Sequence, residues 1–243
     1  MRWRKRAGVR WLEAELPGAR AAFSTRLGGV SDGPFASLNL GWLTGDKRVP
    51  ENRRRLTAAL GLDARDVLIG RQVHAAEVVR HEARMDPPVF ARPAPAREAD
   101  GQATSSPGLA PLVFVADCLP VALAGTRGVA MIHCGWRGLA EGIVERGVDE
   151  VDARTAAIGP GIGPCCYEVG EEVAREFDWL GDGIVRGRML DLVEVARRLL
   201  GRVGVSDVEV AELCTSCEAD LFFSHRRDAG VTGRQGGLVW AVE

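Results

Sequence analysis

The chain consists largely of short apolar runs, each ended by a glycine, a proline or a polar residue. Runs this short, rich in β-branched residues and bounded by turn-forming residues, are typical of buried β-strands. The clearest examples are residues 112–116, 121–124, 129–133, 156–158 and 208–211. The sequence therefore predicts a core built from several short strands, with helices between some of them.

Three segments follow a helical pattern. Residues 50–60 begin with proline, which is favoured in the first turn of a helix, and a second helix is expected at 138–151. In residues 192–203 the apolar side chains share one face and the charged ones cover the other. Asp191 precedes this third segment and Glu194 lies three residues further on, which is the spacing of a helix cap.

The composition excludes several classes of protein. Lys and Arg total 31 against 33 Asp and Glu, a net charge of −2, so the chain lacks the basic excess with which nucleic-acid binders neutralise phosphates. Charges at Arg10, Glu13 and Glu15 interrupt the apolar stretch that a secretion signal needs. No uncharged run approaches the roughly 18 residues of a membrane span. We expect a soluble cytoplasmic protein whose six cysteines are reduced.

The 243 residues fit one large domain or two small ones. Residues 85–97 contain four prolines and predict an extended surface loop. The segments 72–74 and 99–101 on either side look like parts of one site, so this loop is not a domain boundary. We expect a single domain over residues 1–243, with residues 1–20 as an N-terminal extension or an edge strand.

Histidine and cysteine end three of the strand-like runs. His74 follows one run, Cys118 a second and His133 a third. Strand ends converge in α/β proteins, and two histidines with one cysteine suit a catalytic zinc that keeps a fourth position open. Such an ion lowers the pKa of bound water to roughly 7. Asp117 is placed to orient the ligands.

Two other interpretations of these residues stay open. A histidine at a strand end is often only a hydrogen-bonded structural residue, and a lone cysteine is often a small buried apolar one. Alternatively, Cys118 or Cys134 is a nucleophile activated by His133 or His74, as in cysteine hydrolases. The spacing does not separate a zinc-bound thiolate from a catalytic one.

The other four cysteines form the pairs Cys165–Cys166 and Cys214–Cys217. A single CxxC is a weak metal signal, and adjacent residues of a strand point to opposite faces. We expect buried or half-buried thiols with a structural role. Among the basic residues, Arg26 beside a glycine turn and Arg137 close to His133 are placed to bind phosphate or a developing oxyanion.

Eleven motifs, in this order along the chain, resemble those of the YfiH family, also called the multicopper polyphenol oxidase or laccase-domain family. They are Phe23-Ser-Thr-Arg-x-Gly-Gly, Asn39-Leu, Glu51-Asn52, Gln72-Val-His74, Ala99-Asp-Gly, Ala116-Asp-Cys118-Leu-Pro, His133-x-Gly-Trp-Arg-Gly, Ile158-Gly-Pro-x-Ile-Gly-Pro-Cys-Cys-Tyr-Glu-Val, Cys214-Thr-x-Cys217, Phe223-Ser-x-Arg-Arg-Asp and Thr232-Gly-Arg-Gln.

The resemblance implies a single α/β domain with mixed sheets layered between helices, in the order α/β/β/α. It also implies a zinc ion held by His74, Cys118 and His133. Members are similar to purine nucleoside phosphorylases that cleave adenosine, inosine and methylthioadenosine to base and sugar 1-phosphate, and they also deaminate adenosine. The expected partners are therefore a nucleoside and phosphate. Catalytic roles fall on the three ligands and Arg137, and substrate or phosphate binding on Arg26, Asn39 and Asp117.

One residue departs from the family pattern, because Cys134 stands where alanine is expected in the His-x-Gly-Trp-Arg-Gly motif. A thiol there either completes the zinc coordination or points away from it. Two further activities are alternatives. Copper-dependent polyphenol oxidation follows from the family's older name, but multicopper centres need many histidines and this chain has four. A cysteine hydrolase that edits cell-wall precursors, with Cys118 as nucleophile, is the other.

Overall fold

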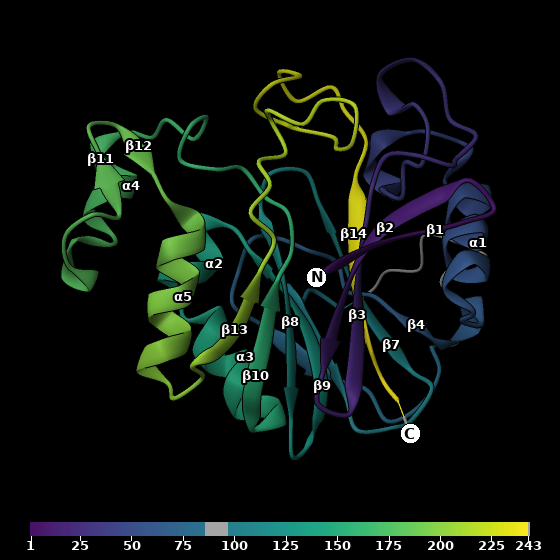
Figure 1. Cartoon of the computed structure of the whole chain (residues 1–243), viewed down its shortest axis with the longest axis horizontal. Coiled ribbons are helices and arrows are strands. Elements are labelled where there is room, and N and C mark those ends of the chain that lie inside the picture. The colour runs from purple at the N-terminus through teal and green to yellow at the C-terminus, as the bar shows by residue number, and fades with distance from the viewer. Residues whose placement is uncertain (86–96, 243) are drawn as a thin grey trace.

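The computed structural model describes residues 1–85 and 97–242 (Figure 1). The predicted proline-rich loop at 85–97 lies almost wholly outside the described residues. The strands of the described part are β1 Arg2–Arg6, β2 Val9–Leu16, β3 Ala19–Ser24, β4 Val67–Leu68, β5 Val78–Arg80, β6 Gly101–Thr104, β7 Ala110–Val115, β8 Leu119–Gly125, β9 Gly128–Cys134, β10 Ala153–Ile158, β11 Val185–Arg186, β12 Met189–Leu190, β13 Asp207–Val210 and β14 Gln235–Ala241. The α-helices are α1 Val49–Leu60, α2 Trp136–Ala140, α3 Ile143–Val151, α4 Glu171–Arg175 and α5 Leu192–Arg202.

Two six-stranded sheets form the centre of the molecule. The first has the strand order β1-β2-β3-β14-β7-β4 and the second the order β13-β10-β8-β9-β6-β5. Both are mixed, because β4–β7, β10–β13 and β5–β6 are parallel pairs and the remaining pairs are antiparallel. The prediction of an α/β fold with mixed sheets is confirmed.

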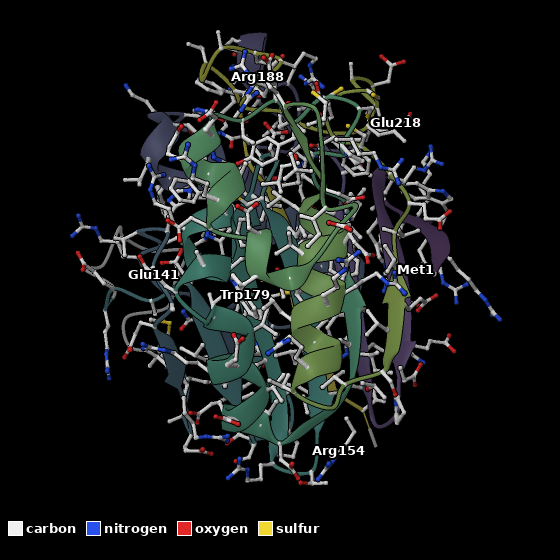
Figure 2. The ribbon with its side chains drawn as sticks, turned by 90° about the vertical axis from the view of Figure 1, so that its left-hand side faces the viewer. Met1, Glu141, Arg154, Trp179, Arg188 and Glu218 are labelled. Carbon is white, nitrogen blue, oxygen red and sulfur yellow. The ribbon has the colours of Figure 1, made fainter. Side chains whose placement is uncertain are left out.

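Apolar side chains fill three layers between these elements. One cluster lies between the two sheets and includes Phe23 and Met131. A second joins the outer face of the second sheet to α3 and α5, and a third packs the first sheet against α1. Figure 1 shows α1 on one side of the sheets and α2, α3 and α5 on the other, and Figure 2 looks onto that second helical side. The layers therefore follow the order α/β/β/α.

The predicted helices are present with one correction. Helix α5 begins where the cap was expected, since the Asp191 carboxylate accepts the backbone N–H of Glu194 at 3.0 Å. The segment predicted as one helix at 138–151 is two, α2 and α3, separated at Gly142. Gly142 has a φ of +88°, a left-handed conformation that an α-helix cannot contain.

The N-terminal residues belong to the first sheet. Strand β1 is its edge strand, and β2 pairs with β1 on one side and β3 on the other. Residues 1–20 therefore include both an edge strand and an interior strand. Within residues 1–85 and 97–242, no helix combines the length and the apolar character that crossing a membrane requires.

Candidate metal centre

His74, Cys118 and His133 lie together although they are far apart in the sequence. Their ligand atoms all lie within 4.8 Å of one another, and the two imidazole rings are 4.9 Å apart between centroids. His133 is buried in β9, Cys118 is half-buried in the turn between β7 and β8, and His74 is exposed in the loop before β5. We call these three residues the His/Cys cluster. It is accessible from the side of His74.

A buried carboxylate, Asp100, holds both histidines in place. Its Oδ1 lies 2.7 Å from Nδ1 of His133 and accepts the backbone N–H of His74 at 3.0 Å. Its Oδ2 accepts the N–H groups of Val73 and Ala75 at 2.9 and 3.0 Å. These bonds fix the His74 loop, in which His74 itself has a φ of +64°. They also occupy Nδ1 of His133, so its Nε2 is the nitrogen left to bind a metal, as in carboxylate–histidine–metal sites.

The electrostatics of the cluster favour a thiolate. Burial by itself would raise the pKa of Cys118, but the charge and hydrogen bonds of His133 and His74 outweigh it and lower that pKa to about 6. Burial likewise disfavours the charged form of His133, whereas the Cys118 thiolate and Asp100 raise its pKa to about 9. The cluster thus carries a negative sulfur beside imidazole groups, which is the form in which cysteine binds metals.

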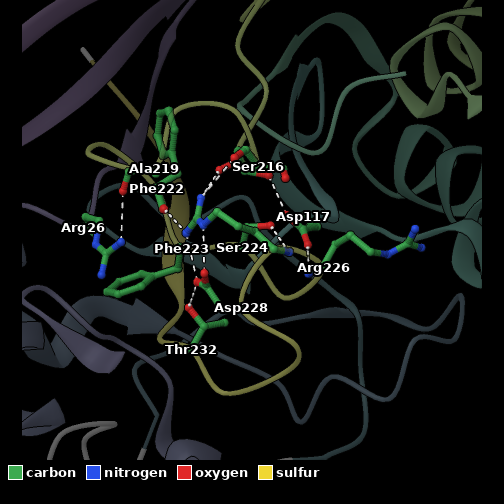
Figure 3. A network of polar contacts seen from close by, with 12 residues as sticks. Arg26, Asp117, Ser216, Ala219, Phe222, Phe223, Ser224, Arg226, Asp228 and Thr232 are labelled. Carbon is green, nitrogen blue, oxygen red and sulfur yellow. Dashed lines mark hydrogen bonds and ion pairs between the residues drawn. The ribbon is translucent and has the colours of Figure 1, made fainter. Parts of the chain in front are cut away.

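Asp117 shapes the turn that presents Cys118. Its φ is +89°, and its carboxylate accepts the Thr215 hydroxyl and the backbone N–H of Arg226, both at 2.7 Å (Figure 3). Its carbonyl accepts the N–H of Ile162 at 2.8 Å. Asp117 was predicted to bind substrate or phosphate or to orient the ligands. Its contacts tie the Cys118 turn to two loops, and its role toward substrate stays a prediction.

Gly135 packs closely against two residues of the cluster. A Cβ atom added to Gly135 would lie 3.0 Å from Sγ of Cys118 and 3.4 Å from Cδ2 of His74. The adjacent Cys134 is fully buried in the layer between the second sheet and its helices, on the opposite face of β9 from His133. Burial raises its pKa well above the usual range. Cys134 therefore points away from the cluster.

Arg137 follows His133 by four residues, and its charge acts on Tyr167, which the charge of Cys118 also influences. Arg137 is exposed at the start of α2, and its guanidinium lies 4.3 Å from the ring centroid of Trp136. Burial and then the negative charge of Cys118 raise the pKa of Tyr167 to about 12, against the opposing charges of Arg226 and Arg137. The charge of Cys118 and the charges of the two arginines therefore all act on the phenol. The sequence analysis missed Tyr167, although it is the only tyrosine of the chain.

Arg26 is engaged by the main chain. It donates through Nε to the carbonyl of Ala36 at 2.7 Å and through Nη1 to that of Ala219 at 3.0 Å. Its guanidinium lies 4.6 Å from the ring centroid of Phe223. Burial, followed by the nearby charge of Arg227, lowers its pKa. Figure 3 shows the bond from Arg26 to Ala219, which joins two loops.

Asn39 is also satisfied inside the protein. It is fully buried, its Nδ2 donates to Thr44 and Asp46, and its Oδ1 accepts the N–H groups of Gly41 and Arg234. These four contacts use the two donors and two acceptor positions of the amide. Asn39 supports the backbone of Arg234, and its predicted contact with substrate stays a prediction.

Arg234 was not singled out by the sequence analysis except as part of a motif. Burial lowers its pKa, while the negative charges of Cys118 and Asp117 act in the opposite direction. A partly buried guanidinium is therefore placed within electrostatic range of the His/Cys cluster. The signal in the sequence was weak, because the residue lies more than 100 positions after Cys118.

A second group of sulfur ligands lies in the loops after β10 and β13. Cys165, Cys166, Cys214 and Cys217 have their Sγ atoms within 4.8 Å of one another, and we call them the four-Cys cluster. The prediction that these thiols are buried or half-buried is wrong for Cys165 and Cys217, which are exposed. Adjacent cysteines were expected to point to opposite faces of a strand. Cys165 and Cys166 instead lie in a turn, where side chains do not alternate between two faces.

The sequence matches a known family and several named proteins. A sequence model of the family described as "Multi-copper polyphenol oxidoreductase laccase" matches residues 20–242. The chain belongs to this family. It is 37% identical over 241 residues to a protein named purine nucleoside phosphorylase YfiH from Escherichia coli (strain K12), which covers 93% of this chain and 95% of that protein. It is 43% identical over 236 residues to a purine nucleoside phosphorylase from Deinococcus radiodurans, with 91% and 87% covered.

A solved structure agrees with the fold. The crystal structure of YlmD from Geobacillus stearothermophilus superposes with a TM-score of 0.89 at 36% identity, covering 99% of each chain. The two-sheet α/β architecture is thus that of this family. The identification as a member of the YfiH family is confirmed.

Proposed function

We propose that this protein is a zinc-dependent purine nucleoside phosphorylase that also deaminates adenosine. The observation that carries the proposal is the His/Cys cluster, in which three ligand atoms converge on an accessible side and Asp100 orients two of them. Relatives that cover nearly the whole chain bear the name purine nucleoside phosphorylase. The proposed substrates are adenosine, inosine or methylthioadenosine, together with phosphate.

The residues present fit a zinc ion. His74 and His133 offer imidazole nitrogens and Cys118 a thiolate, a donor set found in catalytic zinc sites with three protein ligands. Gly135 leaves the space over Cys118 and His74 that a side chain would fill. A zinc ion bound there supplies a Lewis acid that polarises a substrate atom. Asp100 keeps the Nδ1 of His133 occupied, so the ring presents the same nitrogen throughout.

In phosphorolysis a phosphate oxygen attacks C1′ of the sugar while the bond from C1′ to the base breaks. The enzyme has to hold a dianion against the sugar, which requires positive charge and directed N–H donors. We assign this task to Arg137, which is exposed and braced against Trp136. Arg234 adds positive charge from the partly buried side. Arg26, Asn39 and Asp117 position the loops around the site.

The departing base needs a proton or a hydrogen bond at its nitrogen. Burial and the Cys118 charge raise the pKa of Tyr167 to about 12, so this phenol stays protonated at neutral pH. It is therefore available as a donor beside the cluster. In deamination, water adds to C6 of adenine and ammonia leaves, and this reaction uses the same binding site without phosphate.

A cysteine hydrolase is the second candidate, because the Cys118 sulfur lies within 4.8 Å of an imidazole nitrogen of each histidine. The two candidates make opposite demands on the metal. A zinc enzyme is active with metal bound and inactive after its removal, whereas a cysteine nucleophile needs its thiolate free. The polyphenol oxidase suggested by the family description needs more histidines than the two that the cluster contains.

The deciding experiment incubates metal-quantified protein with adenosine, with and without phosphate. We expect adenine and ribose 1-phosphate only when phosphate is present, and inosine with or without it. A chelator should abolish both products and added zinc should restore them. Zinc-loaded protein that forms neither product would contradict the proposal. Gain of esterase or amidase activity on metal removal favours the hydrolase, and phenol oxidation only after copper loading favours the oxidase.

A further inference from the structure

We propose that the four-Cys cluster is a second metal site, a structural zinc tetrathiolate that joins the loop after β10 to the loop after β13. The cluster is separate from the His/Cys cluster and shares no ligand with it. Cys165 and Cys166 come from the first loop, and Cys214 and Cys217 from the second. The inference therefore does not depend on the activity proposed above.

The sulfur positions match a tetrahedral site. A zinc ion bound to four thiolates has Zn–S bonds of about 2.3 Å, and the sulfurs of such a tetrahedron are about 3.8 Å apart. Sγ of Cys217 lies 3.5 Å from that of Cys165 and 3.4 Å from that of Cys166. All four sulfurs fall within 4.8 Å of one another. Small side-chain rotations bring these distances to the tetrahedral value.

The second loop has the local form of a zinc-binding CxxC turn. The backbone N–H of Gly163 donates to Sγ of Cys214 at 3.2 Å. Such N–H donors stabilise metal-bound thiolates and orient them, as outer hydrogen bonds do in other metal sites. Gly163 belongs to the first loop, so this hydrogen bond holds the first pair of cysteines next to the second pair.

The first loop turns so that two adjacent cysteines face the same partners. The carbonyl of Gly163 accepts the N–H groups of Cys166 and Tyr167 at 3.0 and 3.1 Å, which closes a tight turn around Cys165. The carbonyl of Gly161 accepts the N–H of Thr215 at 2.9 Å and ties this turn to the second loop. Both pairs of ligands are therefore held by main-chain hydrogen bonds in the structure as it stands.

A metal explains this arrangement better than a disulfide does. A disulfide joins two sulfurs, whereas Cys217 is equally close to Cys165 and Cys166, and Cys214 completes the group. Four thiolate donors select zinc among the common divalent ions, with iron as the other metal that suits this geometry. On binding, each thiol that is still protonated releases its proton to solvent, four Zn–S bonds form and no electron is transferred.

The site would stabilise the surroundings of the His/Cys cluster. The same two loops supply Tyr167, the N–H of Ile162 and the hydroxyl of Thr215, and the last two bind Asp117 beside Cys118. Glu218, directly after the last cysteine, lies at the end of the molecule where these loops gather (Figure 2). Because all four coordination positions come from the protein, the ion would take no part in chemistry.

The test compares zinc content and stability in four purified full-length proteins prepared under reducing conditions. These are the unchanged chain, Cys217→Ser, His74→Ala and the control Cys134→Ala, which changes a cysteine outside both clusters. We expect Cys217→Ser to lose one zinc ion per chain and to unfold at a lower temperature. Cobalt loaded into His74→Ala should give the strong thiolate-to-cobalt absorption of a tetrathiolate site, and Cys134→Ala should keep the zinc content of the unchanged chain.

A second measurement on the unchanged chain guards against misfolded variants. Zinc added to chelator-treated protein should protect Cys165, Cys166, Cys214 and Cys217 together from alkylation, read residue by residue by mass spectrometry, whereas magnesium should not. Alkylation unaffected by zinc, a disulfide among these residues in freshly reduced and purified protein, or equal zinc in Cys217→Ser and the unchanged chain would overturn the site. A red iron-containing protein would overturn the assignment to zinc.

Discussion

The two clusters of this chain are built on different scaffolds. The His/Cys cluster combines one residue of strand β9, His133, with a turn residue and a loop residue, offers three donors of two kinds and contacts the buried carboxylate of Asp100. The four-Cys cluster lies on two loops, has four ligands of one kind and is oriented by backbone N–H groups such as that of Gly163. One offers three donors, with an exposed histidine among them, and the other offers four, the number that a closed tetrahedral site needs.

The number of protein ligands distinguishes catalytic metal sites, which have three, from structural metal sites, which have four. A site with three protein ligands leaves a position at which a substrate atom can bind, so the protein must keep its ligands aligned without a fourth. Here the four hydrogen bonds of Asp100 provide that alignment. A four-ligand site is aligned by its own metal. Changes in and around the His/Cys cluster should therefore alter activity, and they should leave the four-Cys cluster intact.

The largest effect is expected from Cys118→Ser. This change removes the only sulfur of the His/Cys cluster. Because loss of an outer partner of a metal ligand already costs about 10–100-fold, kcat/KM for adenosine phosphorolysis should fall by more than about 100-fold. The protein should lose one zinc ion per chain, measured by mass spectrometry of the metal, while the zinc of the four-Cys cluster remains. Unchanged zinc and activity would remove Cys118 from the site.

Asp100→Asn should have the next largest effect. The amide keeps the size of the carboxylate but can accept at only one of the two oxygen positions, which now bind His133 and three backbone N–H groups. We expect roughly 10–100-fold weaker zinc binding at the His/Cys cluster and a similar loss of activity. The control is Asp149→Asn, an exposed residue of α3. Equal zinc affinity in the two variants would contradict the role of Asp100.

Gly135→Ala should have a smaller effect on activity. The new methyl group would lie 3.0 Å from Sγ of Cys118, so the thiol has to shift. Overpacking of this kind destabilises proteins by about 1–3 kcal/mol, and we expect a few-fold loss of activity, measured by denaturant unfolding and steady-state kinetics. The matched control is Gly201→Ala in α5, where a Cβ meets no atom within 4 Å. That change should stabilise the protein by about 0.5–1 kcal/mol.

The smallest effect on the site is expected from Cys134→Ala. This thiol is buried on the face of β9 opposite His133, so its removal should cost about 1 kcal/mol in the free energy of unfolding. Zinc content and activity should stay at the level of the unchanged chain. Loss of zinc from the His/Cys cluster would show that Cys134 is a fourth ligand, and the open three-ligand interpretation would then be wrong.

Much of the local structure could be predicted because its signals lie within a few residues. The single-faced apolar pattern of 192–203 and the cap at Asp191 gave the third helix with its correct start. The predicted helix at 138–151 was wrong in the middle, because Gly142 ends one helix and starts another by adopting a positive φ. A single glycine in a helical pattern is also compatible with an unbroken helix, so the sequence did not distinguish the two.

The sequence likewise indicated some features of the candidate site and not others. His74, Cys118 and His133 were found from strand ends and from the family resemblance, and the structure brings their ligand atoms together. Asn39 and Arg26, whose predicted contacts with substrate stay predictions, form hydrogen bonds with residues of distant segments. Hydrogen-bond partners that come from elsewhere in the chain leave no trace in the spacing around a residue.

By itself the sequence indicated several of the core strands, the capped helix, the near-zero net charge and the three residues of the His/Cys cluster. Periodicity, end signals and charge are properties of short segments or of the whole composition, and the chain displays them directly. The tertiary structure alone decided that Asp100 orients both histidines, that Cys134 faces away, and that two pairs of cysteines meet. These depend on which sheet edges and loops become neighbours, and packing sets that only when the whole chain folds.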